Sequence, residues 1–385
     1  MDLIYSTSYY VLNYNPISLG FNYLFPTSSS NYINNYQLIR KPKKDEILKY
    51  ELIMIDMDGV LRNGNKRIGL ADMVINKLNT FNKKYIIITN ECRREPRQIR
   101  QELKTMNINI PDNVPIVSAS QLVKKTLLKS IIGNNSKFDS KKNKDSFNQK
   151  IGIIGTNNEY LYYKKSFKNY TNVRVYWISN NNLPNNLDYI VIGCVNNDDN
   201  LDKHFNKCLQ WVMNNLDSTL IISCPDLQDI ENKDKITHYL PIPFLKELEI
   251  RVNNRDKSIN FNSIYLDPEK NKNFDSSAFK INHKQIIVGK PETDFIIDLL
   301  KHYKILDKNI NKTEDLPSLK DKVLMIGDNL NTDIKLSEKI NCDAALLLSG
   351  VTSNDDLVNI HTSYNGNQLI ESIKYIVPDL SQLFL

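Results

Sequence analysis

The chain has 385 residues, a net charge of +6 and 41% hydrophobic residues, which is enough for one large domain or two ordinary ones. Its lysines are spread among asparagines along the whole sequence and form no concentrated basic face, which argues against nucleic acid as a partner. Five cysteines without C-x-x-C spacing fit neither a disulfide framework nor a zinc site, so we expect a reducing, cytoplasmic location. The sequence lacks a run of about 18 strongly apolar residues, so we expect no membrane span.

Residues 1–44 differ in composition from the rest of the chain. No acidic residue lies between Asp2 and Asp45, and Tyr, Ser and Asn dominate the segment. We expect an N-terminal extension that is disordered or loosely attached. An organellar transit segment stays open as the alternative, because such segments are also acid-poor and Ser-rich, although they carry more Arg.

From residue 51 onward, short apolar runs alternate with stretches of helical spacing. The runs predict buried strands, and the repeated order of strand and helix is typical of an α/β fold with a parallel sheet. The expected strands are Glu51–Asp56, Tyr85–Thr89, Ile151–Ile154, Val173–Ile178, Tyr189–Ile192, Leu220–Ser223, Gln285–Val288, Lys322–Ile326 and Ala344–Leu348. The expected helices include Glu95–Met106, His204–Asn215, Glu292–Tyr303 and Leu330–Ile340.

The order of these predicted strands and helices indicates one sheet domain interrupted by a second domain. Residues 45–90 and 284–385 would form the core, and residues 91–283 would form the inserted domain. Two stretches rich in Asn, Lys and Ser, near 133–149 and 228–283, interrupt the inserted part. We expect them to be solvated insertions in surface loops, which cost little entropy even when they are long.

The sequence Asp56-Met57-Asp58-Gly59 follows the first predicted strand. An Asp can attack phosphorus as a nucleophile, and a second Asp nearby can reach the leaving oxygen. Gly59 would let the backbone approach a phosphate, whose oxygens loop N–H groups can bind. Taken alone, the same four residues also suit an ordinary turn.

A second pair of acids, Asp328 and Asp333, follows the predicted strand Lys322–Ile326. The carboxyl ends of parallel strands are where ligands bind in open sheets, so these acids would meet Asp56 and Asp58 there. Four carboxylates would repel one another without a cation, and Mg²⁺ prefers such oxygen ligands. We therefore expect Asp328 to bind Mg²⁺ directly and Asp333 to bind it through water or to orient Asp328.

Three further residues follow predicted strands with chemistry suited to a phosphate. Thr89 and Asn90 offer a hydroxyl and an amide as donors, although a helix N-cap is an equally good interpretation. Lys290 comes directly after the strand Gln285–Val288 and would bring a positive charge to the phosphate and the nucleophile.

Together, these motifs resemble those of the haloacid dehalogenase-like superfamily. D-M-D-G-V-L is similar to its first motif, Thr89-Asn90 to its second, Lys290 to its third and G-D-N-L-N-T-D-I to its fourth. The surrounding sequence, including "DGVLRNGNKRIG" and "VGKPETDFI", resembles the branch that holds p-nitrophenylphosphatases, phosphoglycolate phosphatases and pyridoxal-phosphate phosphatases. The resemblance covers roughly residues 51–385 and is weakest across the insertions.

The resemblance implies a Rossmann-like core with an α/β cap inserted between the second and third motifs. It implies a Mg²⁺-dependent phosphatase in which Asp56 is the nucleophile and Asp58 is the general acid and then the base. Mg²⁺ would be held by Asp56, the Asp58 carbonyl and Asp328. Thr89, Asn90 and Lys290 would hold the phosphate of a small phosphorylated metabolite, and a homodimer formed through the cap stays open.

The sequence departs from the family pattern in three places. Glu91 stands where a second Asn is frequent, and Val195 and Cys224 replace an acid and an Asn in the cap. Asp226 is kept, and we expect it to contact the substrate. A phosphotransferase that uses the same intermediate and a catalytically silent scaffold are the alternatives to a phosphatase.

Overall fold

The computed structural model describes residues 39–135, 149–179, 184, 186–196, 201–215, 217–226, 238–245, 284–293, 295–361, 370 and 372–385. Most of the predicted extension 1–44 and of the insertions near 133–149 and 228–283 lies outside these residues. The end of the extension is attached to the core, because Arg40 pairs with Ile376 through two backbone hydrogen bonds of 2.9 and 3.0 Å.

Six parallel strands form the core sheet in the order β15-β14-β13-β1-β4-β5. These strands are β1 (Leu52–Ile55), β4 (Tyr85–Thr89), β5 (Ile116–Ser118), β13 (Val323–Gly327), β14 (Asp343–Leu347) and β15 (Tyr375–Val377). All of their residues are buried, as continuous apolar runs require in a sheet that is covered on both faces.

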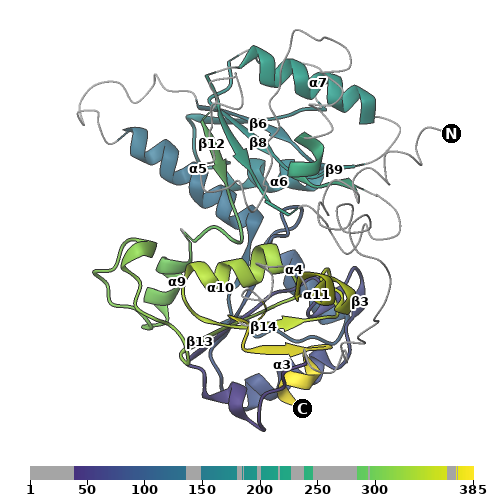
Figure 1. Ribbon diagram of the computed structural model, residues 1–385. Coiled ribbons are helices and arrows are strands. Elements are labelled where there is room, and N and C mark those ends of the chain that lie inside the picture. Colours follow the sequence, from purple (N-terminus) through teal and green to yellow (C-terminus); the bar gives the residue numbers. More distant parts are fainter. Residues whose placement is uncertain are drawn as a thin grey trace, which may run out of the picture.

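Alternate residues of β1 enter two different hydrophobic clusters. Ile53 and Ile55 belong to a cluster with residues of α3 and α4, whereas Leu52 and Met54 belong to a cluster with residues of α9 and α10. The sheet is therefore the middle of three layers (Figure 1). The helices of the core are α3 (Ala71–Thr80), α4 (Pro96–Thr105), α9 (Ile296–His302), α10 (Lys335–Lys339), α11 (Asn354–His361) and α13 (Ser381–Phe384).

The cap is a second, smaller α/β unit above the core in Figure 1. Its five parallel strands lie in the order β12-β10-β8-β6-β7, and a short antiparallel ladder joins β9 to β11. The strands are β6 (Gln149–Ile154), β7 (Val173–Trp177), β8 (Tyr189–Ile192), β9 (Val195–Asn196), β10 (Thr219–Ile222), β11 (His238–Tyr239) and β12 (Gln285–Ile287). Its helices are α5 (Ala119–Asn135), α6 (Asn157–Ser166) and α7 (Leu201–Asn214).

The predicted fold class, a Rossmann-like parallel core with an inserted α/β cap, is confirmed. The predicted boundaries at residues 90 and 284 are wrong for two strands. Ile116–Ser118 pairs with β4 in the core sheet, and Gln285–Ile287 pairs with β10 in the cap sheet. The chain thus enters the cap after β5 and leaves it after β12. Strand pairing, and not the strand's place beside a motif, decides which sheet a strand joins.

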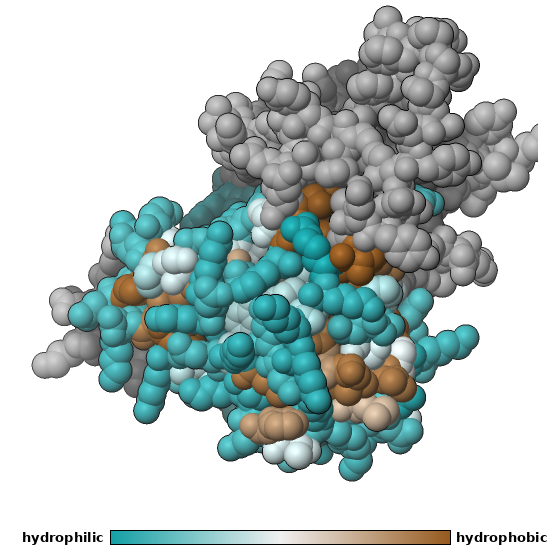
Figure 2. Space-filling model, turned by 60° about the horizontal axis from the view of Figure 1, so that its bottom comes forward, coloured by the Kyte–Doolittle hydropathy of each residue, from teal (hydrophilic) through white to brown (hydrophobic). Residues whose placement is uncertain are grey.

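Among the described residues, no helix is long and apolar enough to cross a membrane. Figure 2 shows that the described surface on the face formed by the core is mostly hydrophilic, with small hydrophobic patches separated by polar side chains. Small and separated apolar patches of this kind are normal for a globular protein.

Candidate active site

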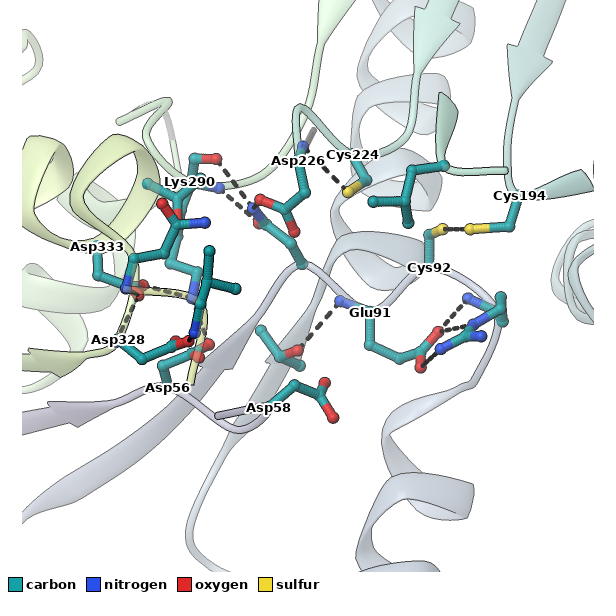
Figure 3. Close-up of a pocket in the computed structure, with 17 residues that line it drawn as sticks. Asp56, Asp58, Glu91, Cys92, Cys194, Cys224, Asp226, Lys290, Asp328 and Asp333 are labelled. Atoms are coloured by element: carbon teal, nitrogen blue, oxygen red, sulfur yellow. Dashed lines mark hydrogen bonds and ion pairs between the residues drawn. The ribbon is translucent and has the colours of Figure 1, made fainter. Parts of the chain in front are cut away.

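The carboxyl ends of three neighbouring core strands bring the predicted residues together. Ile55 of β1 is in register with Ile326 of β13, so Asp56 and Asp328, which follow these strands, lie side by side. Thr89 ends β4 on the other side of β1. One pocket between core and cap is lined by all three residues (Figure 3).

Three buried carboxylates form the centre of this pocket. Asp56, Asp328 and Asp333 offer oxygen atoms that all lie within 4.8 Å of one another. Burial raises the pKa of Asp56 well above its usual range and that of Asp328 to about 7, and the neighbouring acids add to both shifts. Such a set of hard oxygen donors fits Mg²⁺, whose charge would offset this repulsion.

Lys290 supplies a cation to the same cluster. Its Nζ donates to Oδ1 of Asp333 at 2.6 Å and to Oδ1 of Asp56. Burial by itself would lower the pKa of Lys290, but Asp333 and Asp56 raise it above its ordinary value, so the side chain is an ammonium. If all three carboxylates are ionised, one ammonium balances one of the three negative charges, and a divalent cation would balance the other two.

Asp333 lies in a π-helical turn, Leu330–Ile334, which precedes α10 where a regular helix was expected. From this turn its Oδ2 accepts the backbone N–H groups of Asp328 and Asn329, at 3.2 and 3.1 Å. A Cβ on Gly327 would overlap the Asp333 carboxyl group. Asp333 therefore fixes the backbone of Asp328, which corresponds to the orienting role that was one of its two predicted roles.

Asp328 is held from two sides. The N–H of Val351 donates to its Oδ2 at 2.5 Å. On the other side lies Gly59, whose φ of +85° is a conformation that favours glycine. A Cβ at Gly59 would overlap the Asp328 carboxylate, so the first acidic motif can approach the second only because Gly59 has no side chain.

The two residues at the end of β4 differ in what they offer a ligand. The Thr89 hydroxyl oxygen accepts the N–H of Glu91 at 3.0 Å, which leaves the hydroxyl hydrogen as the group to donate. The Asn90 amide bonds the N–H and the carbonyl of Lys290 at 2.8 and 3.0 Å and Oδ1 of Asp226 at 2.8 Å. These three bonds make the Asn90 side chain a clamp between core and cap, and its predicted contact with phosphate stays a prediction.

The structure places Asp226 at the cap side of the pocket, near Cys224 and near two cysteines, Cys92 and Cys194, that the sequence did not connect with the site. Burial raises the pKa of Asp226 to about 6. Cys92, Cys194 and Cys224 line the same side, and the Sγ atoms of Cys92 and Cys194 lie 3.3 Å apart as free thiols. Burial contributes to raising the pKa of all three thiols, so they are neutral. Neutral thiols behave as small hydrophobic groups, and this wall of the pocket is therefore apolar.

Asp58 lies at the edge of the pocket with 27% of its side chain exposed. Its Oδ1 accepts a hydrogen bond of 2.8 Å from Nε of Arg62, a residue that the sequence analysis did not single out. Nothing in the sequence distinguishes Arg62, since its long basic side chain would be expected at the surface of a hairpin.

Two family models match the parts of the chain that carry these residues. A model of haloacid dehalogenase-like hydrolases matches residues 53–137, and a HAD-hydrolase-like model matches residues 287–383. The acid sugar phosphatase of Staphylococcus saprophyticus is 33% identical over 70 residues, which are 18% of this chain and 27% of that protein. The chain thus matches about a quarter of the length of this curated relative.

Solved structures resemble the chain over most of its length. A protein from Cytophaga hutchinsonii described as a "possible sugar phosphatase" is 17% identical, with a TM-score of 0.57 over 88% of this chain and 98% of that one. The p-nitrophenyl phosphatase of Archaeoglobus fulgidus is 17% identical, with a TM-score of 0.52 over 86% and 97%. NagD from Escherichia coli K-12 is 15% identical, with a TM-score of 0.52 over 87% and 98%. At these identities, the likeness shows that the core and cap share a known arrangement.

Proposed function

The chain belongs to the haloacid dehalogenase-like hydrolase superfamily, and on that premise we propose that it is a phosphatase that hydrolyses a small phosphomonoester. The observation that carries the proposal is the buried cluster of Asp56, Asp328, Asp333 and Lys290 in one pocket with Asp58. The names of similar proteins, an acid sugar phosphatase and a p-nitrophenyl phosphatase, favour sugar and aryl phosphates as the substrate class.

The acidic cluster would hold Mg²⁺. Asp56 and Asp328 would be its carboxylate ligands, with the Asp58 carbonyl as a further ligand and Asp333 behind them. When bound, Mg²⁺ would offset the negative charges of the acids and of the phosphate. Lys290 and the Thr89 hydroxyl would hold phosphate oxygens.

In the first step, a carboxylate oxygen of Asp56 attacks phosphorus and the bond from phosphorus to the ester oxygen breaks. Asp58, as the carboxylic acid, donates its proton to that oxygen, so the alcohol leaves neutral. The product is an aspartyl-phosphate. In the second step, the Asp58 carboxylate takes a proton from water, the water oxygen attacks phosphorus, and Asp56 is released with inorganic phosphate.

The cap would enclose the alcohol part of the substrate. Its side of the pocket offers the Asp226 carboxyl group beside Leu240 and three buried cysteines. A carboxyl group can accept hydrogen bonds from hydroxyl groups, whereas Leu240 and the thiols suit carbon surfaces. This combination supports a small, partly hydroxylated substrate from which bulk water is excluded.

The test compares wild-type protein with Asp56→Asn in the hydrolysis of p-nitrophenyl phosphate with Mg²⁺. We expect the variant to lose at least about 1,000-fold in kcat, because the amide is a poor nucleophile toward phosphorus. Asp45→Asn is the matched control, since Asp45 makes an ion pair with Lys77 at the surface. Full turnover by Asp56→Asn would contradict the proposal, and a product yield that rises with an added acceptor alcohol would indicate a phosphotransferase.

A further inference from the structure

A fully buried arginine begins the hairpin of β2 (Arg62–Asn63) and β3 (Lys66–Arg67), close behind Asp58. Nε of Arg62 donates to Oδ1 of Asp58 and Nη1 donates to Oε2 of Glu102, both at 2.8 Å. Nη2 lies 3.8 Å from Oε2 of Glu91. A buried charge without partners would be strongly destabilising, so these carboxylates are what permits a guanidinium at this position.

Two of the three carboxylates are fixed by other cations. Glu91 has a side chain that is 1% exposed and pairs with both Arg93 and Arg94. Burial by itself would raise the pKa of Glu91, but Arg93 and Arg94 lower it to about 2, so Glu91 is ionised. Glu102 of α4 also forms an ion pair with Arg94, whose Nε lies 3.0 Å from Oε1 of Glu102. Glu91 and Glu102 therefore form a rigid acidic frame for the guanidinium of Arg62.

The third carboxylate, that of Asp58, belongs to a residue that lines the pocket (Figure 3). The bond from Nε of Arg62 to Oδ1 restricts rotation of this carboxyl group. A backbone hydrogen bond also links the segment of Asp58 to that of Arg62, because the N–H of Gly59 donates to the carbonyl of Arg62 at 2.8 Å. Side chain and backbone thus fix the position of Asp58 relative to the frame formed by Glu91 and Glu102.

We propose that Arg62 is a positioning residue for proton transfer, one that holds the Asp58 carboxyl group in the orientation from which it protonates the leaving oxygen. This inference rests on the proposed function, in which Asp58 is the general acid. The planar guanidinium of Arg62 pairs with Asp58 through Nε while its two Nη atoms face Glu91 and Glu102. The single ammonium of a lysine cannot reproduce this arrangement.

The test uses two aryl phosphates that differ in one nitro group, p-nitrophenyl phosphate and phenyl phosphate. Nitrophenolate leaves without help from an acid, whereas phenolate is more basic and benefits from protonation. For each variant, kcat/KM for p-nitrophenyl phosphate is divided by kcat/KM for phenyl phosphate. A defect in binding lowers both values alike and leaves this ratio unchanged, whereas loss of the general acid lowers the value for phenyl phosphate more. The variants are Arg62→Lys, Glu102→Gln and Asp58→Asn, assayed with Mg²⁺.

We expect Asp58→Asn to widen the ratio in favour of p-nitrophenyl phosphate by about 100-fold, because the acid is lost. Arg62→Lys should widen it by about 10-fold, because the acid is present but misplaced. Glu102→Gln removes one anchor of Arg62 and leaves the arginine in place, so a smaller change in the same direction is expected. Arg67→Met is the matched control, because Arg67 lies in the same hairpin and its partly exposed side chain pairs with Asp72, at 2.6 Å, away from Asp58.

The outcomes separate this inference from the function on which it rests. If Arg62→Lys and Glu102→Gln slow both substrates equally while Asp58→Asn still widens the ratio, Arg62 has only a structural role and the inference is overturned. If Asp58→Asn leaves the ratio unchanged, Asp58 is not the general acid, and both the proposed mechanism and the inference about Arg62 are overturned. If Arg62→Lys does not fold, Glu102→Gln decides the question by itself.

Discussion

At the scale of single residues, the site is organised by side chains that hold other residues in place. Asn90 is the clearest example, because its amide bonds the backbone of Lys290 on both sides and also the Asp226 carboxyl group. The Lys290 ammonium is thereby attached to the strand tip that carries Thr89. Its position relative to Asp56 depends on this clamp.

Replacing Asn90 with Ala should destabilise the protein and disturb Lys290. The change leaves a buried N–H of Lys290 and the Asp226 carboxyl group without their partner, and we expect a loss of about 2–4 kcal/mol in the free energy of unfolding. Urea unfolding measures this loss. Asn109→Ala at the exposed Asn109 is the control, with an expected change within about 0.5 kcal/mol. Equal stabilities of the two variants would show that the clamp contributes nothing.

At the scale of elements, two loops after adjacent strands approach so closely that only glycine fits between them. Gly59 follows β1 and faces the carboxylate of Asp328, which follows β13. Ser349 adds a third segment, because its hydroxyl donates to the Gly59 carbonyl at 2.7 Å. The acids of the first and fourth motifs are thus brought together by loop geometry as well as by strand register.

Gly59→Ala should remove most activity while the fold persists. A Cβ there would displace the Asp328 carboxylate, so we expect kcat/KM to fall by about 100-fold or more, as small misplacements in a catalytic centre do. Gly69→Ala is the matched control: Gly69 also has a positive φ, of +47°, but its Cβ would meet Asp379 only at 3.6 Å. Both variants share the backbone strain, so a similar loss of activity in both would assign the effect to strain.

The elements of the core and several residues of the site could be predicted because they depend on local sequence. Apolar runs that end in acids indicated strand tips, and these tips do place Asp56 beside Asp328. The cap boundaries could not be predicted for two different reasons. Ile116–Ser118 is a three-residue strand that the apolar pattern did not single out, although it pairs with its neighbour in the chain, β4. Gln285–Ile287 was predicted as a strand, but its pairing with β10 lies across the long insertion 228–283 and is not encoded locally. Arg62 could not be found among 50 lysines and arginines, since only its burial distinguishes it.

At the scale of the whole molecule, the metal-free protein carries a concentration of negative charge between its two parts. Burial raises the pKa of Asp328 from 3.8 to about 7, so the folded state binds a proton more tightly than the unfolded state does. The resulting stabilisation is fully present below pH 3.8 and is lost as the pH rises through about 7. Above that pH, the metal-free fold contains an ionised Asp328 among other acids.

Asp328→Asn should therefore stabilise the metal-free protein at pH 8 and abolish its response to Mg²⁺. For wild-type protein, Mg²⁺ at 100 times its dissociation constant adds about 2.7 kcal/mol to the free energy of unfolding. Thermal unfolding with EDTA and then with Mg²⁺ measures both effects. A variant that is destabilised with EDTA, or still stabilised by Mg²⁺, would contradict the assignment of Asp328 as a ligand.

The return path of the chain from cap to core limits how far the two parts can be separated. Lys290 is the third residue after Ile287, the last residue of β12, and β12 is an edge strand of the cap sheet paired with β10. A shortened protein in which a linker replaces the cap would keep Asp56, Asp328 and Asp333, but it would lose the strand that anchors the lysine among them. The cap is consequently not a detachable module, since the ammonium that pairs with Asp56 and Asp333 lies on a segment that begins inside it.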